Sequence, residues 1–143
     1  MFKLHKWIII GFVIFGLGSC TLEKTQNNFT KVDEVVFTDE ENKINATVIT
    51  HSNYELQIHG EASGTWFFEA EFGLELLDEN NNLLSEGFVT AQGEWMTVDY
   101  VPFMGKIAYL SPETEYGYLI FKKANPSGLE QYDFKKSVKV KIK

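Results

Sequence analysis

The last residues of the chain alternate strictly between apolar and charged side chains. Val138, Val140 and Ile142 occupy every second position, and lysines occupy the positions between them. Successive side chains of a β-strand point to opposite faces, so this segment predicts a strand with one buried and one solvated face. Such a strand is typical of an antiparallel sheet, and the pattern does not fit the 3.6-residue period of a helix.

Short strand patterns separated by turn residues continue through most of the chain. Beyond the last strand they cover residues 44–50, 54–60, 72–76, 83–89, 99–110 and 116–121. Asp78 and the asparagines that follow it favour a turn, so Phe72–Val89 is predicted to be a hairpin. About seven short strands with no long helical period predict an all-β fold, an antiparallel β-sandwich.

The length and composition favour one folded domain. The chain has 143 residues, of which 44% are hydrophobic and 15% aromatic. That content is enough for one buried core and too little for two. We predict the domain over residues 43–143, preceded by a flexible tether over residues 20–42. Val32 and the apolar run from Val35 to Phe37 would also fit a short flanking strand, but a solvated linker is the preferred interpretation.

The N-terminus has the order of a secretory signal. Lys3 and Lys6 precede an uncharged apolar run over residues 7–17, which is shorter than the roughly 20 residues of a membrane-spanning helix. Small residues then lead to Cys20, the single cysteine, which therefore has no intramolecular disulfide partner. A free thiol after an ordinary signal peptide and an uncleaved anchor are the alternatives to the interpretation that follows.

Leu17-Gly18-Ser19-Cys20 resembles the lipobox of bacterial lipoproteins. The resemblance implies a signal peptide over residues 1–19, cleavage before Cys20 and a diacylglyceryl group on its thiol. Two or more acyl chains give stable membrane anchoring. We therefore expect a lipid-anchored protein of the cell envelope, with its domain on the extracytoplasmic side of a bacterial membrane.

The charge of the chain limits its partners. It has 20 acidic residues and 13 lysines, and it contains no arginine. Removal of Lys3 and Lys6 with the signal would change the formal net charge from −7 to −9. So acidic a chain is poorly suited to nucleic acid or to anionic lipid headgroups, because both need cationic side chains. We expect membrane attachment through the lipid on Cys20 alone, and no nucleic-acid partner.

Three segments carry most of the distinctive motifs: Gly60–Ala70, Thr90–Met96 and Asn125–Gly128. In this order they resemble the immunoglobulin-like domain of bacterial spore-germination proteins, over roughly Ile44 to Ile142. The resemblance implies an immunoglobulin-like sandwich with no known enzymatic activity, carried by secreted or membrane-attached envelope proteins.

The candidate contact residues come from these segments. They are Trp66, Phe67, Glu69, Glu94, Trp95, Asn125 and Ser127. The segments lie between predicted strands, and the loops of a sandwich gather at its two ends, so at least two of the clusters are expected to meet. The alternative for Trp66 and Phe68 is to plug the end of the sandwich, and for Trp95 it is a core position.

Catalytic and metal chemistry find little support in the sequence. Glu69 and Glu94 would act on a glycosidic bond only if their carboxyl groups faced each other across a cleft about 5–10 Å wide. We interpret them as solvated or backbone-capping groups. His51, His59 and an acylated Cys20 do not make up a zinc site. We expect no enzyme activity, no cofactor and no metal.

The preferred function is therefore binding to an envelope partner, either a protein or a cell-wall glycan. Two alternatives stay open. One is a structural or assembly role in which an open sheet edge pairs with another envelope protein. The other is an unrecognised hydrolase.

Overall fold

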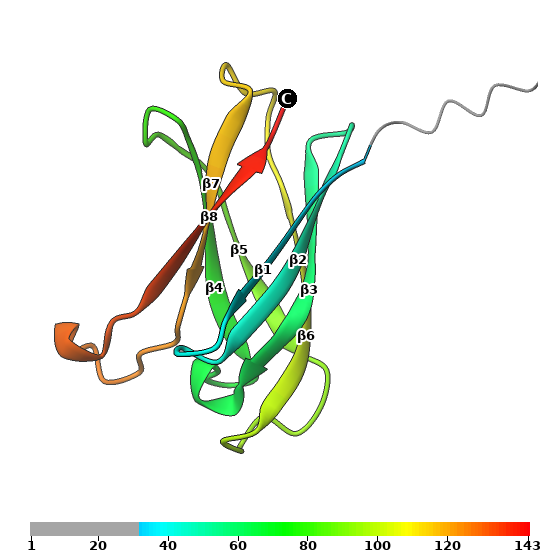
Figure 1. Cartoon of the computed structure of the whole chain (residues 1–143). Coiled ribbons are helices and arrows are strands. Elements are labelled where there is room, and N and C mark those ends of the chain that lie inside the picture. The colour runs from blue at the N-terminus through cyan, green and yellow to red at the C-terminus, as the bar shows by residue number, and fades with distance from the viewer. Residues whose placement is uncertain (1–31) are drawn as a thin grey trace, which may run out of the picture.

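The computed structural model describes residues 32–143, which form an all-β domain with two short 3₁₀ helices (Figure 1). The strands are β1 (Asp33–Asp39), β2 (Ile44–His51), β3 (Glu55–Ser63), β4 (Glu71–Asp78), β5 (Leu83–Ala91), β6 (Tyr100–Ala108), β7 (Tyr116–Lys122) and β8 (Lys135–Lys141). The 3₁₀ helices are η1 (Gly64–Trp66) and η2 (Glu130–Tyr132). Within this part of the chain, no helix has the length and apolar character that crossing a membrane requires.

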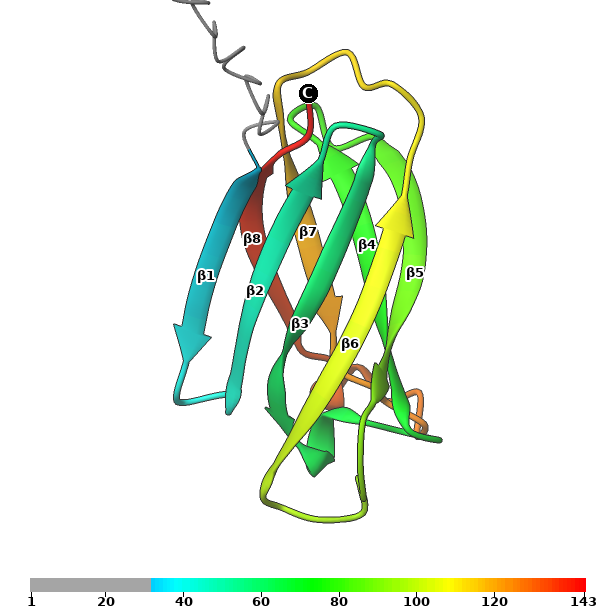
Figure 2. The same cartoon turned by 90° about the vertical axis from the view of Figure 1, so that its right-hand side faces the viewer.

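The strands form one antiparallel sheet that folds over into two layers. Its order is β1-β2-β3-β6-β5-β4-β7-β8. Strands β1, β2, β3 and β6 form one layer and β4, β5, β7 and β8 the other (Figure 2). The layers join where β5 pairs with β6 over only Val89–Ala91 and Phe103–Gly105. The predicted all-β sandwich is confirmed.

The junction of the layers depends on Gly105. A Cβ atom at this position would lie 2.7 Å from the main-chain oxygen of Phe88 and 2.8 Å from Cγ1 of Val89. Any larger residue would therefore push β5 away from β6 at the corner. The absence of a side chain lets the chain cross from one layer to the other while both inner faces stay packed.

On the opposite side the sheet remains open, and side chains bridge the seam between β1 and β8. Lys136 Nζ lies 3.0 Å from Oδ2 of Asp39, and Lys141 Nζ lies 3.4 Å from Oδ2 of Asp33. Between these ion pairs the rings of Phe37 and Phe121 meet edge to face at 5.1 Å. The two free edges thus face each other across the seam.

The core lies between the layers and follows the alternation of the strands. Val138, Val140 and Ile142 are all buried, as the sequence predicts. Phe72 pairs directly with Val89 in the β4–β5 hairpin, which confirms the predicted hairpin. The largest fully buried side chains are Trp66, Phe72, Phe103 and Phe121.

Residues 33–39 correct the predicted tether. This segment forms β1, which pairs with β2 over its whole length, so the sheet has eight strands and not about seven. Val35 and Phe37 pack against the core, and charged residues on the seam side of β1 bind lysines of β8. The charges that suggested a linker therefore belong to a strand. The signal peptide, Cys20 and the first part of the tether lie outside the described residues.

Candidate functional site

All seven candidate residues lie in loops at one end of the sandwich. This loop end comprises the β1–β2 turn, the β3–β4 loop with η1, the β5–β6 loop and the β7–β8 loop, and it lies at the bottom of Figure 1. The C-terminus and the start of β1 lie at the other end (Figure 1). The expectation that clusters distant in the sequence share one end of the domain is thus met by the topology.

In the Gly60–Ala70 segment, the side chains of Trp66 and Phe67 point into the core. Ser63 caps η1, and this short helix directs Trp66 into the core, where it is only 1% exposed. The Trp66 ring packs against Phe72 and Phe134, and Phe67 is also buried against Phe72. Trp66 and Phe67 are therefore corrected from contact residues to core residues.

Phe68 does not plug the end of the sandwich, which was the alternative expected for it. Its side chain is about half exposed, because Glu69 and Ala70 adopt positive φ angles of 53° and 66° and turn the chain back toward β4. Glu69 itself is exposed beside it. Trp66 plugs the end of the sandwich, and Phe68 does not.

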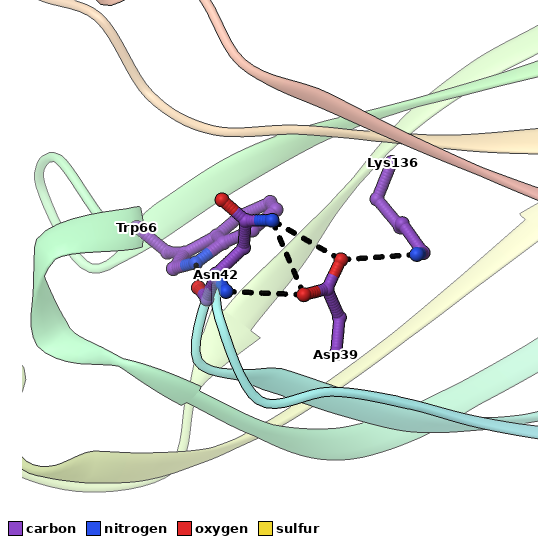
Figure 3. A network of polar contacts seen from close by, with 4 residues as sticks. All are labelled: Asp39, Asn42, Trp66 and Lys136. Carbon is purple, nitrogen blue, oxygen red and sulfur yellow. Dashed lines mark hydrogen bonds and ion pairs between the residues drawn. The ribbon is translucent and has the colours of Figure 1, made fainter.

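A polar network ties Trp66 to the seam (Figure 3). The indole Nε1 donates to the main-chain oxygen of Asn42 at 2.7 Å. Asn42 in turn donates to Asp39 from its main-chain nitrogen at 3.0 Å, and Lys136 donates to the same carboxylate at 3.0 Å. These donors, Asn42 first and Lys136 second, lower the pKa of Asp39 below its usual value.

The β3–β4 and β5–β6 loops are pinned together at Gly64. Its main-chain nitrogen donates to the oxygen of Asp99 at 3.0 Å. A Cβ atom on Gly64 would lie 2.1 Å from the oxygen of Thr97 and 2.2 Å from that of Trp95, so only glycine permits this approach. Trp95 is half-buried and packs against the core without being part of it. Glu94 is exposed, and its carboxylate accepts the main-chain N–H of Met96 at 3.0 Å.

Asn125 and Ser127 shape the β7–β8 loop. Asn125 Nδ2 donates to the oxygen of Leu129 at 2.9 Å and to Oδ1 of Asp133 at 2.7 Å. Ser127 donates to Oδ1 of Asn125 at 2.6 Å and accepts from the nitrogen of Leu129. These contacts occupy most of the polar groups of both side chains, so their first role is to hold the wall of the neighbouring cleft.

The cleft opens between the β1–β2 turn, η1 and the β7–β8 loop, with a volume of about 610 Å³. Of the seven candidate residues, Trp66, Asn125 and Ser127 line it, whereas Phe67, Glu69, Glu94 and Trp95 do not. Its charged lining residues are Glu41, Lys43, Lys123 and Asp133. Tyr132 and Val98 add exposed apolar surface at its rim.

Sequence reasoning missed most of these lining residues. Lys43 and Lys123 lie immediately beside strand ends, and Tyr132 lies in η2. Their position next to turn residues was the available signal, since side chains at strand ends reach the loops. Among residues 32–143, no group of three or more His, Cys, Asp or Glu side chains is placed to hold a metal ion.

Two packed antiparallel layers of strands define an immunoglobulin-like β-sandwich. The family model for the immunoglobulin-like domain of bacterial spore germination, Gmad2, matches residues 44–130. The chain belongs to this family, which confirms the resemblance seen in the sequence. The match spans β2 to η2 and leaves out the seam strands β1 and β8. Comparisons with curated proteins and with solved structures found no match.

Proposed function

We propose that this chain is a lipid-anchored protein of the bacterial cell envelope whose immunoglobulin-like domain binds a cell-wall component without catalysis. Family membership supports a binding domain of this kind. The observation that carries the proposal is the cleft at the loop end, which residues from four separate loops build together. The link of the family to spore germination would place such binding in the spore envelope.

The position of the chain's entry into the domain supports an anchored orientation. Val32 precedes β1, which begins at the end opposite the cleft (Figure 1). Cys20 lies twelve positions before Val32 in the sequence. Fully extended, a chain of that length reaches at most about 40 Å. A lipid on Cys20 would therefore attach the domain to the bilayer from the end opposite the cleft.

The lining of the cleft suits a hydroxylated polymer. Tyr132 is 58% exposed and offers a ring face at the rim, while Gln131 and the charged residues supply hydrogen-bonding groups. Binding sites for small ligands and sugars combine such apolar surface with a few polar groups that fix orientation. Pairing through a sheet edge has less support, because the free edges of β1 and β8 face each other and are bridged by ion pairs.

Co-sedimentation tests the proposal. Purified full-length protein in detergent is mixed with bacterial cell-wall sacculi and centrifuged, and the wild type is expected in the pellet. Tyr132→Ala should weaken binding, whereas Leu110→Ala, an exposed apolar residue between β6 and β7 at the other end, should not. Wild-type protein that stays in the supernatant, with a stoichiometric protein partner recovered from solubilised envelope, would support the assembly role instead.

A further inference from the structure

The lysines of the domain divide into two groups. Lys106, Lys122, Lys136, Lys139 and Lys141 each have a carboxylate within ion-pair distance. Among residues 32–143, no such carboxylate partner lies near Lys43, Lys123, Lys135 or Lys143. Four of the nine lysines in this part of the chain are thus unpaired, although acidic residues outnumber lysines about two to one, and their positions distinguish them.

Three of the four unpaired lysines gather at the loop end. Lys43 and Lys123 line the cleft from the β1–β2 turn and from the end of β7. Lys123 also lines a neighbouring hollow of about 250 Å³ together with Lys135, and Asp133 and Phe134 border both cavities. The cleft and the hollow are therefore neighbours, and three unpaired lysines line them; Lys122, which also lines the hollow, is paired with Glu75.

The carboxylates at this surface offset only part of these charges, because two of them, Glu41 and Asp133, lie among three unpaired lysines. Oδ1 of Asp133 accepts a hydrogen bond from Asn125 at 2.7 Å and belongs to the network that shapes the loop. Glu41 lines the cleft but lies beyond ion-pair distance of Lys43 and Lys123. Ammonium groups without a partner remain available to an anion that enters the cleft.

We infer that the cleft recognises an anionic group of the bound polymer, with Lys43 and Lys123 as its ammonium ligands and Lys135 as a third contact. This inference rests on the proposed function and names the chemistry of its ligand. The group is a carboxylate or a phosphodiester on a hydroxylated chain, and the ring of Tyr132 at the rim packs against the apolar part of the same chain. The acidity of the remaining surface repels the polymer elsewhere and restricts it to this end.

The test compares charge-removing variants in the co-sedimentation assay. Lys43→Gln combined with Lys123→Gln should weaken binding about tenfold or more, and added salt should weaken wild-type binding further. Lys143→Gln is the matched control, because Lys143 is also unpaired and lies at the opposite end, and it should bind within about twofold of wild type. Circular dichroism should show the same fold for all variants.

Two wall preparations identify the source of the anion. Sacculi stripped of phosphate-containing polymers with hydrofluoric acid retain only the carboxylates of the peptidoglycan. Lysine-dependent binding that disappears after stripping assigns a phosphodiester, and lysine-dependent binding that persists assigns a carboxylate. If the double variant binds as well as wild type, or if Lys143→Gln weakens binding as much as the double variant does, this inference is overturned. The proposed function then still stands. Wild-type protein that binds neither preparation overturns both.

Discussion

The indole nitrogen of Trp66 lies 2.7 Å from the main-chain oxygen of Asn42 and donates a hydrogen bond to it (Figure 3). Through Asn42 this bond reaches Asp39 and then Lys136 on β8. One buried tryptophan therefore connects the β3–β4 loop, the β1–β2 turn and the seam. Asn42 and Trp66 also line the cleft, so its shape depends on their hydrogen bond.

Replacing Trp66 should destabilise the domain in two distinguishable steps. Trp66→Phe keeps much of the packing but leaves the oxygen of Asn42 without its donor, which should lower the free energy of unfolding by about 1–3 kcal/mol. Trp66→Ala also opens a cavity beside Phe72 and should cost about 3–5 kcal/mol. Urea unfolding followed by circular dichroism measures both. A Trp66→Phe variant as stable as wild type would contradict a role for the hydrogen bond, and equal losses for the two variants would contradict the added cost of the cavity.

Gly64→Ala should loosen the contact between the β3–β4 and β5–β6 loops. The added methyl group would collide with the main-chain oxygens of Thr97 and Trp95, at an expected cost of about 1–3 kcal/mol. Gly93→Ala is the control, because a Cβ atom there meets nothing within 4 Å, and it should stay within about 0.5 kcal/mol of wild type. Thermal unfolding compares the two variants. Equal melting temperatures would contradict a stabilising role for the close contact between Gly64 and the β5–β6 loop.

The seam should weaken in acid through Asp39. Its pKa is held below the usual value of 3.8 by the N–H of Asn42 and by Lys136. A lowered folded-state pKa means that the stabilisation is complete above pH 3.8 and disappears as the pH falls through the folded-state value. Asp39→Asn should therefore melt below wild type at neutral pH, with a gap that closes toward pH 2. A gap that is independent of pH would contradict this account.

The alkaline limit should depend on Tyr109. Burial, with a smaller contribution from Tyr54, raises the pKa of Tyr109 from 10.0 to about 12. Its hydroxyl donates to the oxygen of Ile142 at 3.1 Å, a bond that ionisation destroys. Because the folded-state pKa is raised, the stabilisation is complete below pH 10 and is lost between pH 10 and 12, by about 2–3 kcal/mol.

Tyrosinate absorbance and urea unfolding check this prediction together. The folded protein should show a late tyrosine ionisation with a pKa of about 12, which belongs to Tyr109. Tyr109→Phe should lose that late step and should also lose less stability than wild type between pH 10 and 12. A Tyr109→Phe variant with an unchanged alkaline titration would exclude Tyr109 as the late group.

Anchoring should depend on Cys20 alone. Cys20→Ala removes the thiol that would carry the acyl chains, and the acidic domain offers little attraction to anionic lipid. The variant should therefore move from the membrane fraction to the soluble fraction after cell breakage. The control is the wild-type chain expressed at the same level, and variant protein that still fractionates with lipid would contradict anchoring through Cys20.

The sequence by itself determined the local structure of this protein. Strand positions such as Val138, Val140 and Ile142, and the Phe72–Val89 hairpin, follow from side-chain alternation and turn chemistry within a few residues of each other. The same local reasoning preferred a linker to a flanking strand at β1, because the alternation there is half charged. Those charges pair with Lys136 and Lys141, about a hundred residues away.

Only the tertiary structure decided which side chains are available for binding. Trp66, Phe67 and Phe68 are neighbours in sequence, yet a 3₁₀ turn buries the first two and leaves the third exposed. Lys43 and Lys123 meet at one cleft because antiparallel pairing places the ends of β2 and β7 at the same end of the sandwich. Such contacts depend on how distant strands pair, which short-range patterns do not encode.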